Sequence, residues 1–208
     1  MPDSKEQAIL EAAIHEFAVK GFERASTNQI TKMAKVSKGL VFHYYKTKEK
    51  LYEASVLYAI EITMTELDFD YKKLLYKGIA GLKKLCELEL SFFRKYPEIV
   101  QLIMTAFMNP PENLTDKMEK LLKDLISLAP QFAREWIQGL DLKEDVDRTV
   151  LEAVFLSHYQ YYFNQSWRYF NQHPEAPFED VKPFFDEFLA MLSMSLRGLV
   201  KDDVDLLQ

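Results

Sequence analysis

The chain has 208 residues, of which 48% are apolar and 28% are charged, with only six glycines and eight prolines. This composition excludes a disordered, fibrous or low-complexity protein and favours folded domains with a sizeable core. No apolar run approaches the roughly 18 to 20 residues of a membrane span, and the N-terminus lacks the apolar core of a signal peptide. A single cysteine, Cys86, excludes an internal disulfide framework and a cysteine zinc cluster. We therefore expect a soluble cytoplasmic protein that does not bind membranes.

The net charge of −6 is unevenly divided along the chain. Residues 1–50 carry a net charge of +3, whereas the remaining residues carry −9. Between residues 24 and 50, Glu49 is the only acidic residue among seven basic ones: Arg24, Lys32, Lys35, Lys38, Lys46, Lys48 and Lys50. A short basic segment in an acidic chain is typical of a phosphate-binding surface, although a solvated charged face has the same pattern.

The first fifty residues predict three short helices. The first has an apolar face with helical spacing, formed by Ile9, Ala12, Ala13 and Phe17, and Gly21 is expected to end it. Thr27 is expected to cap the second helix and Ser37 the third, which runs to about Tyr45. The tight turn between the last two helices predicts a helix-turn-helix.

The rest of the chain also has helical periodicity. A fourth helix is predicted from Lys48 to about Asp68, with one apolar stripe at Leu51, Ala54, Tyr58 and Ile62 and another at Leu57, Ile60, Met64 and Leu67. Thr47 is expected to cap it. Further helices are expected at about 71–95, 98–108, 112–138, 143–172 and 178–200. The prediction is therefore an all-α protein of about nine helices, with a DNA-binding domain at 1–47 and a helical domain at 48–208.

The last two predicted helices are very apolar. Ten of the fourteen residues in 150–163 and eleven of the seventeen in 184–200 are apolar. A helix that is apolar nearly all round needs neighbours on every side. We therefore expect a homodimer that pairs helices 143–172 and 178–200 of two chains in a four-helix bundle, although burial within one large core is the alternative.

The third predicted helix carries side chains suited to DNA. Val41 and Tyr45 lie four residues apart and share the face that packs on the first two helices. The start of such a helix enters the major groove, so the residues expected to read base edges are Asn28, Lys38, Gly39, Leu40, Phe42 and His43. The hydroxyl and ammonium groups expected to contact phosphates belong to Thr27, Tyr44 and Lys48.

The stretch AKVSKGLVFHYYKTKEKL, from Ala34 to Leu51, resembles the recognition element of the TetR-type (TetR/AcrR) transcriptional regulators. The upstream residues Ala12-Ala13, Phe17, Gly21-Phe22 and Ala25-Ser26-Thr27 match as well, so the resemblance in motif covers about the first fifty-five residues. The sequence departs from the family pattern at two positions. Lys35 stands where the family usually has glycine, which predicts a left-handed backbone there. Leu40 replaces a small hydroxyl residue, so no hydroxyl is available at that base position.

The resemblance implies a ligand-responsive transcriptional regulator, usually a repressor, that binds a palindromic double-stranded DNA operator as a homodimer. Two recognition helices must match half-sites about 34 to 36 Å apart. The resemblance also implies that a small-molecule effector binds the C-terminal domain and alters this spacing. A ligand that prefers the mis-spaced state weakens DNA binding by its differential affinity.

Aromatic residues in the C-terminal half predict an apolar or aromatic effector. Eight aromatics lie within residues 155–170, and methionines on other helices can adapt to a ligand's shape. The expected ligand-binding residues are Tyr58, Ile62, Met104, Phe107, Trp136, Tyr159 and Tyr162, and the alternative for each is an ordinary core or dimer contact. Glu87 and Glu89 are expected on a solvated face. An inward-facing carboxylate at either position would favour a cationic ligand.

The sequence predicts no cofactor, metal site or catalytic centre. The four histidines and one cysteine have no zinc-ligand spacing, and phosphate-loop and nucleophile-elbow motifs are absent. Two alternatives to the regulator remain open. One is a dimeric helical module whose basic end docks an acidic protein without sequence-specific DNA affinity. The other is a helical-bundle enzyme for an apolar substrate, which would need an inward-facing acid–base pair.

Overall fold

A computed structural model describes residues 4–66, 78–108, 116–173, 176 and 178–201 of the chain. The chain divides into two compact units, each built from two separate segments. Unit 1 comprises Met1–Asp68 and Tyr96–Lys123, and unit 2 comprises Phe69–Lys95 and Asp124–Gln208.

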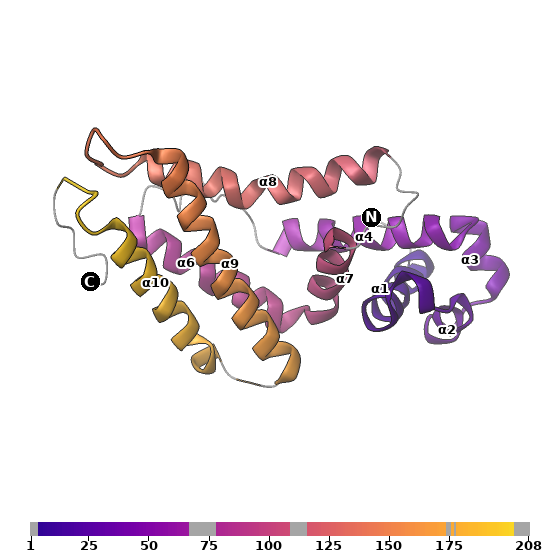
Figure 1. Cartoon of the computed structure of the whole chain (residues 1–208). Coiled ribbons are helices and arrows are strands. Elements are labelled where there is room, and N and C mark those ends of the chain that lie inside the picture. Colours follow the sequence, from indigo (N-terminus) through magenta and orange to yellow (C-terminus); the bar gives the residue numbers. More distant parts are fainter. Residues whose placement is uncertain (1–3, 67–77, 109–115, 174–175, 177, 202–208) are drawn as a thin grey trace. The chain divides into compact units, whose positions relative to one another are not determined.

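Within the described ranges the structure is helical (Figure 1). The α-helices are α1 (Ser4–Arg24), α2 (Thr27–Met33), α3 (Lys38–Tyr45), α4 (Lys48–Glu66), α6 (Gly78–Lys95), α7 (Pro97–Met108), α8 (Asp116–Gln138), α9 (Arg148–Gln172) and α10 (Lys182–Leu196), with a 3-10 turn at Phe178–Asp180. The predicted all-α class, with a helix-turn-helix before a larger helical part, is confirmed. None of the described helices is long and apolar enough to cross a membrane.

In unit 1, α1 packs against both α4 and α7. The apolar face predicted for α1 is buried, with Ile9, Ala13 and Phe17 fully inaccessible to solvent. Tyr52 of α4 packs edge-on against Phe17, with a ring-centroid distance of 5.0 Å. At Gly21 the backbone has a φ of 70°, so α1 kinks at the residue expected to end it. These contacts hold the helix-turn-helix on a base formed by α4 and α7.

The start of α2 differs from the prediction. Thr27 is the first helical residue, and Ser26 occupies the cap position without a side-chain cap hydrogen bond. The buried carboxylate of Glu16 on α1 accepts a hydrogen bond from the Ser26 backbone N–H at 2.9 Å. A side chain ten residues away thus satisfies the N–H of the residue that precedes α2, and the expected side-chain cap of its first turn is not formed.

The buried face of α4 also differs from the predicted stripes. It consists of Leu51, Tyr52, Ser55, Val56, Ala59 and Ile60. Ser55 is fully buried because its hydroxyl donates to the Leu51 carbonyl oxygen at 2.7 Å. Met64, expected in an apolar stripe, is 45% exposed.

Unit 2 is organised around the packing of α9 on α10. Tyr162 of α9 stacks on Phe188 of α10 with a ring-centroid distance of 5.6 Å, and both side chains are buried. Phe93 of α6 meets Phe163 of α9 edge to face at 5.1 Å. The aromatic residues that dominate the sequence of α9 thus form much of the core of unit 2.

α9 begins later in the sequence than predicted, and α10 ends earlier than predicted. The carboxylate of Asp147 accepts hydrogen bonds from the Thr149 and Val150 N–H groups, so α9 begins at Arg148 rather than 143. An isolated antiparallel bridge joins Leu142 to Val200, which keeps both segments out of the helices. The predicted ranges 143–172 and 178–200 are therefore wrong at these ends.

Candidate nucleic-acid interface and ligand site

The turn between α2 and α3 is held by backbone hydrogen bonds. The Val36 N–H donates to the Thr31 carbonyl at 3.1 Å, and the Lys35 N–H donates to the Lys32 carbonyl at 3.2 Å. Lys35 has a φ of 55°, so the left-handed backbone predicted for it is confirmed. The Ser37 hydroxyl accepts from the Leu40 N–H at 3.2 Å, which confirms Ser37 as the cap of α3.

One face of α3 is fixed in the core of unit 1. Val41 and Tyr45 are 2% and 8% exposed, as their spacing predicted. The Tyr45 hydroxyl also donates to the Glu6 carboxylate at 3.2 Å. This packing determines which side chains of α3 point outward and so makes the outer face a rigid surface.

The outer face of α3 carries most of the predicted base-reading residues. Lys38, Gly39 and His43 are exposed, and Leu40 and Phe42 are partly exposed. Asn28, on α2, is exposed too.

Gly39 has no internal packing role. A Cβ built at this position would meet only the Ser37 Oγ within 4 Å, at 3.9 Å. The position therefore leaves room for a backbone such as that of DNA to approach.

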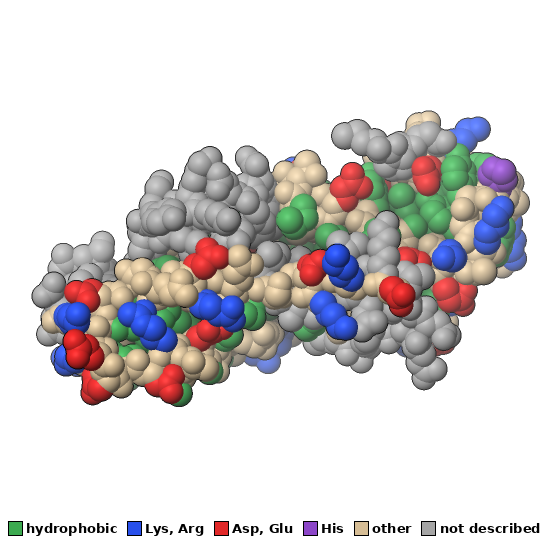
Figure 2. Space-filling model, turned by 90° about the horizontal axis from the view of Figure 1, so that it is seen from above, with side chains coloured by type: hydrophobic (Ala, Val, Ile, Leu, Met, Phe, Trp, Pro, Cys, Tyr) green, Lys and Arg blue, Asp and Glu red, His purple; other side chains and the backbone are tan. Residues whose placement is uncertain are grey.

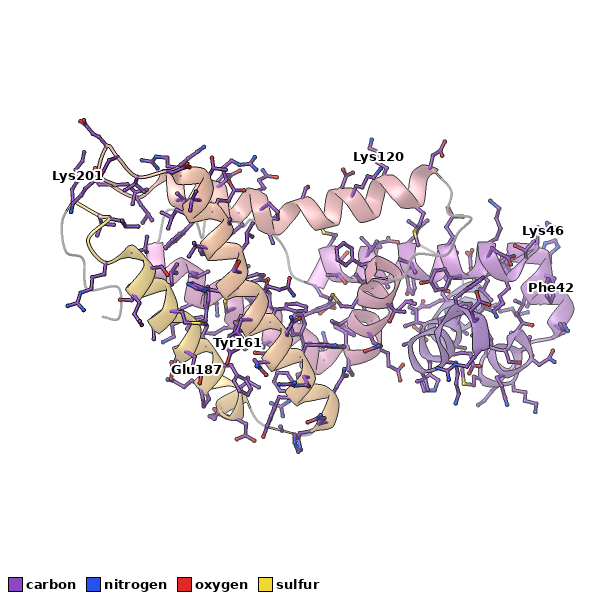
Figure 3. The ribbon with its side chains drawn as sticks, viewed as in Figure 1. Phe42, Lys46, Lys120, Tyr161, Glu187 and Lys201 are labelled. Carbon is purple, nitrogen blue, oxygen red and sulfur yellow. The ribbon has the colours of Figure 1, made fainter. Side chains whose placement is uncertain are left out.

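Lys38 and Phe42 form a cation–π contact on this surface. The Lys38 Nζ lies 5.8 Å from the centroid of the Phe42 ring. This contact directs the lysine along α3 without using its hydrogen-bond donors. In Figure 3, Phe42 lies in α3, close to Lys46.

The structure adds Lys46 to the candidates that the sequence suggested. Lys46 is exposed directly after α3 and has a φ of 62°. Its basic surroundings and its place between the third and fourth predicted helices were signals for a phosphate contact, but its left-handed backbone was not expected. Figure 2 shows Lys and Arg side chains and a histidine around an apolar patch at the end of unit 1 that carries α2 and α3.

The predicted phosphate contacts have different surroundings. Thr27 and Tyr44 are partly exposed. The Lys48 Nζ donates to the Glu23 carbonyl at 3.1 Å and lies 4.9 Å from the Phe22 ring centroid. Lys48 thus ties the start of α4 to the end of α1 and has further N–H groups for an anion. The expected cap of α4 is confirmed, since the Thr47 hydroxyl accepts from the Lys50 N–H at 3.2 Å.

The seven predicted ligand-binding residues divide between the two units. In unit 1, Tyr58 and Ile62 on α4 and Met104 on α7 are partly exposed, and Phe107 is 40% exposed. In unit 2, Trp136 and Tyr162 are 2% and 1% exposed, whereas Tyr159 is partly exposed.

The three unit 2 residues lie together around Phe155. Centroid distances are 5.4 Å from Trp136 to Phe155, 6.5 Å from Phe155 to Tyr159 and 6.2 Å from Tyr159 to Tyr162. We call Trp136, Phe155, Tyr159 and Tyr162 the aromatic cluster. The cluster joins α8 to α9 inside unit 2.

A carboxylate reaches the aromatic cluster from α6, which corrects the expectation that Glu89 lies on a solvated face. Its Oε1 accepts a hydrogen bond from the Tyr159 hydroxyl at 2.5 Å, and its Oε2 is buried. Burial raises the pKa of Glu89 to about 7, and the hydrogen bond from Tyr159 opposes part of that rise. Burial likewise raises the pKa of the neighbouring Cys86 thiol well above its ordinary value.

The same region leaves several polar atoms unsatisfied. Among the described residues, Glu89 Oε2, Trp136 Nε1, Tyr162 OH and Ser166 Oγ are buried without a hydrogen-bond partner. No group of three or more potential metal ligands occurs in the part of the chain that the structure describes. The aromatic cluster therefore lies in an apolar environment with a few unsatisfied polar atoms. Binding sites for small organic molecules have the same character.

Comparisons with known proteins agree with this arrangement. The profile of the family described as "Bacterial regulatory proteins, tetR family" matches residues 9–55, which span α2, α3 and parts of α1 and α4. The HTH-type transcriptional regulator RutR of Escherichia coli (strain K12) is 28% identical over 136 residues, covering 65% of this chain and 63% of RutR. The matched region thus spans less than two thirds of that relative.

Other similarities extend over more of the chain. The HTH-type transcriptional repressor NicS of Pseudomonas putida is 23% identical over 201 residues, covering 95% of this chain and 93% of NicS. The crystal structure of AibR in complex with isovaleryl coenzyme A and operator DNA shares the fold, with a TM-score of 0.56 and 19% identity over 74% of this chain and 83% of that chain. The profile match and the regulators that the chain resembles lead to one conclusion: residues 9–55 form the helix-turn-helix region of the tetR family of bacterial regulatory proteins.

Proposed function

We propose that the chain is a ligand-responsive transcriptional regulator, acting as a repressor, and has no enzymatic activity. The observation that carries this proposal is the exposed face of α3, with Lys38, Gly39 and His43 displayed on a capped helix whose other face is buried. This is the geometry that places a helix in the major groove. RutR and NicS bear the names of transcriptional regulators, and NicS that of a repressor.

The proposed assignment of residues follows their positions. Asn28, Lys38, Gly39, Leu40, Phe42 and His43 read bases, and Thr27, Tyr44 and Lys48 contact phosphates. Lys38 can donate to guanine, and Leu40 can meet a thymine methyl group. We retain 1–47 as the DNA-binding domain and 48–208 as the ligand-binding and dimerisation domain.

The operator is proposed to be a palindromic duplex that binds a homodimer. α9 and α10 supply the dimer surface, because they expose large apolar side chains at Val150 (59%) and Met194 (77%). Figure 3 shows Tyr161 of α9 beside Glu187 of α10, and the tyrosine hydroxyl donates to that carboxylate at 3.1 Å. This bond joins α9 to α10 within one chain, so the two helices can present their apolar side chains as one surface.

A small apolar or aromatic effector is proposed to release the DNA. The chain passes from α6 of unit 2 to α7 of unit 1 at Tyr96, and α7 packs on α1 and α4. The Nδ1 of His15 on α1 lies 2.6 Å from Oε1 of Glu98 on α7, within hydrogen-bond distance. A ligand that shifts α6 thus has a covalent and packed route to α1. The effect on DNA binding is limited to the ligand's difference in affinity between the two states.

Fluorescence anisotropy with duplex DNA from upstream of the chain's own gene tests the proposal. We expect a site bound at least about a thousandfold more tightly than random duplex, with affinity falling steeply as salt rises. Replacing Lys38 or His43 with alanine should change the preferred sequence, whereas Lys48→Ala should weaken every duplex alike. Lys83→Ala, at an exposed lysine of α6, is the matched control and should change neither.

Two results would contradict this account. Equal affinity for all duplexes would remove the operator and favour the module that docks an acidic protein. Equal losses on every sequence for Lys38→Ala, His43→Ala and Lys48→Ala would refute the division between base and phosphate contacts.

A further inference from the structure

The carboxylate of Glu89 is buried in a place where the chain gives it one partner. Oε1 accepts the Tyr159 hydroxyl, and Oε2 has no hydrogen-bond partner among the described residues. Glu87, two residues earlier on the same helix, has a carboxylate in contact with solvent and close to a lysine. Glu87 has a side chain that is 38% exposed and lies 3.6 Å from the Lys84 Nζ.

Neither protonation state satisfies Glu89. When it is ionised, a buried negative charge lacks a counter-charge, since no described lysine, arginine or histidine forms an ion pair with it. When it is protonated on Oε1, that O–H can donate to the Tyr159 hydroxyl, but Oε2 still lacks a donor. The titratable groups that act on this site are Cys86 on α6 and Tyr159 and Tyr162 on α9, and none of them carries a positive charge. The missing partner is therefore a donor, and a cation serves best.

The surroundings of Glu89 suit an organic cation. The rings of Tyr159, Phe155 and Trp136 follow one another at centroid distances of 6.5 and 5.4 Å. Aromatic faces attract cations and also stack on flat apolar groups. Native proteins leave few buried polar atoms without partners. Two such atoms in unit 2, Glu89 Oε2 and Trp136 Nε1, indicate a place where a ligand completes the bonding.

We propose that the aromatic cluster binds the effector and that this effector is an aromatic amine, whose ammonium group pairs with the Glu89 carboxylate while its ring stacks among Phe155, Tyr159 and Trp136. The inference rests on the proposed function in one respect, because it identifies the ligand of the cluster with the effector. It narrows the effector class from apolar or aromatic molecules to cationic aromatic ones, because the ionised Glu89 carboxylate attracts cations and repels anions.

The pairing predicts a dependence of affinity on pH. An ammonium ligand binds the ionised form of Glu89, and with a pKa of about 7 that form rises from about one tenth at pH 6 to about nine tenths at pH 8. Burial moves the pKa values of Cys86, Tyr159 and Tyr162 upward, away from this range. Affinity for the amine should therefore increase by up to about tenfold between pH 6 and pH 8.

Isothermal titration calorimetry of the full chain tests the proposal with three probes of one shape: naphthylmethylamine, naphthylmethanol and naphthoate. We expect the amine to bind at least about tenfold more tightly than the alcohol, and the acid to bind most weakly. Glu89→Gln should remove the preference for the amine, whereas the control Glu87→Gln should keep it. The change with pH should appear for the amine and not for the alcohol.

The proposal is overturned if the alcohol matches the amine, if the preference survives Glu89→Gln, or if the amine fails to bind by about 1 mM. Should Glu89→Gln not fold, the pH series on the unmodified chain decides, and a flat series for the amine refutes the pairing. Calorimetry uses no DNA. A failure here therefore leaves operator binding intact, and a failure to bind operator leaves the calorimetric result valid.

Discussion

Replacing Glu89 with glutamine should change how the stability of the chain depends on pH. Burial raises the pKa of Glu89 from 4.5 to about 7, so between these values the folded chain holds a proton that the unfolded chain has released. The free energy of unfolding therefore falls as pH rises through this window, by about 1.4 kcal/mol per pH unit. Below pH 4.5, burial of Glu89 does not lower the free energy of unfolding. Above about pH 7, the loss of unfolding free energy has reached its full size.

The shift of about 2.5 units corresponds to a total of roughly 3 kcal/mol, most of which lies between pH 5 and pH 8. Glutamine cannot ionise, so the stability advantage of the variant over the unmodified chain should grow by roughly 2 to 3 kcal/mol from pH 5 to pH 8. Urea denaturation at fixed protein concentration measures the difference, followed by circular dichroism. Glu87→Gln, at a solvated carboxylate on the same helix, should follow the profile of the unmodified chain. Parallel profiles for Glu89→Gln and the unmodified chain would refute the reasoning that burial penalises this charge.

Three further substitutions test the local geometry of unit 1 by thermal unfolding. Lys35→Gly should stabilise the chain by about 1 kcal/mol because φ is 55° at this turn, and a lower Tm would show that the left-handed backbone is not strained. Ser37→Ala should cost about 1 kcal/mol by removing the acceptor of the Leu40 N–H, and an unchanged Tm would contradict that cap. Glu16→Ala should cost about 1 to 3 kcal/mol by leaving the Ser26 N–H without its acceptor, whereas Glu16→Gln should recover part of that loss; equal effects of the two would argue against the hydrogen bond.

The features that the sequence predicted well are set by neighbouring residues. Val41 and Tyr45 are buried because residues four apart share a helix face, whatever the rest of the chain does. Ser37 and Thr47 cap the helices that they precede because a hydroxyl reaches the N–H three residues on. The left-handed turn at Lys35 followed from a family pattern that has glycine there.

The features that the sequence missed depend on distant residues. Thr27 was assigned a cap that α2 does not have, and the Ser26 N–H before this helix is satisfied by Glu16, ten residues away. Ser55 was not expected in the core because a serine hydroxyl is polar. Its burial is possible because the hydroxyl donates to the Leu51 carbonyl, a hydrogen bond that exists only once the helix has formed. The pairing of Leu142 with Val200 shortened two helices through a contact 58 positions apart in sequence.

The candidate sites divide in the same way. The outer face of α3 follows from local periodicity, and its predicted residues lie together on one element. The inward turn of Glu89 could not be seen from α6 alone, because it depends on the Tyr159 hydroxyl of α9. Glu89 was therefore considered for the ligand site only on the condition that it faced inward.

The two-segment composition of unit 1 affects how the DNA-binding head can be exchanged between proteins. α1 rests on α7, a helix that the chain reaches only after crossing α6 of the other unit. A chimaera spliced at Lys48 would place foreign counterparts of both α4 and α7 against α1. Transplanting the head with its native contacts would require α4 and residues 97–108 to be transferred with it, so the packing of α1 on these two helices decides which hybrid regulators fold.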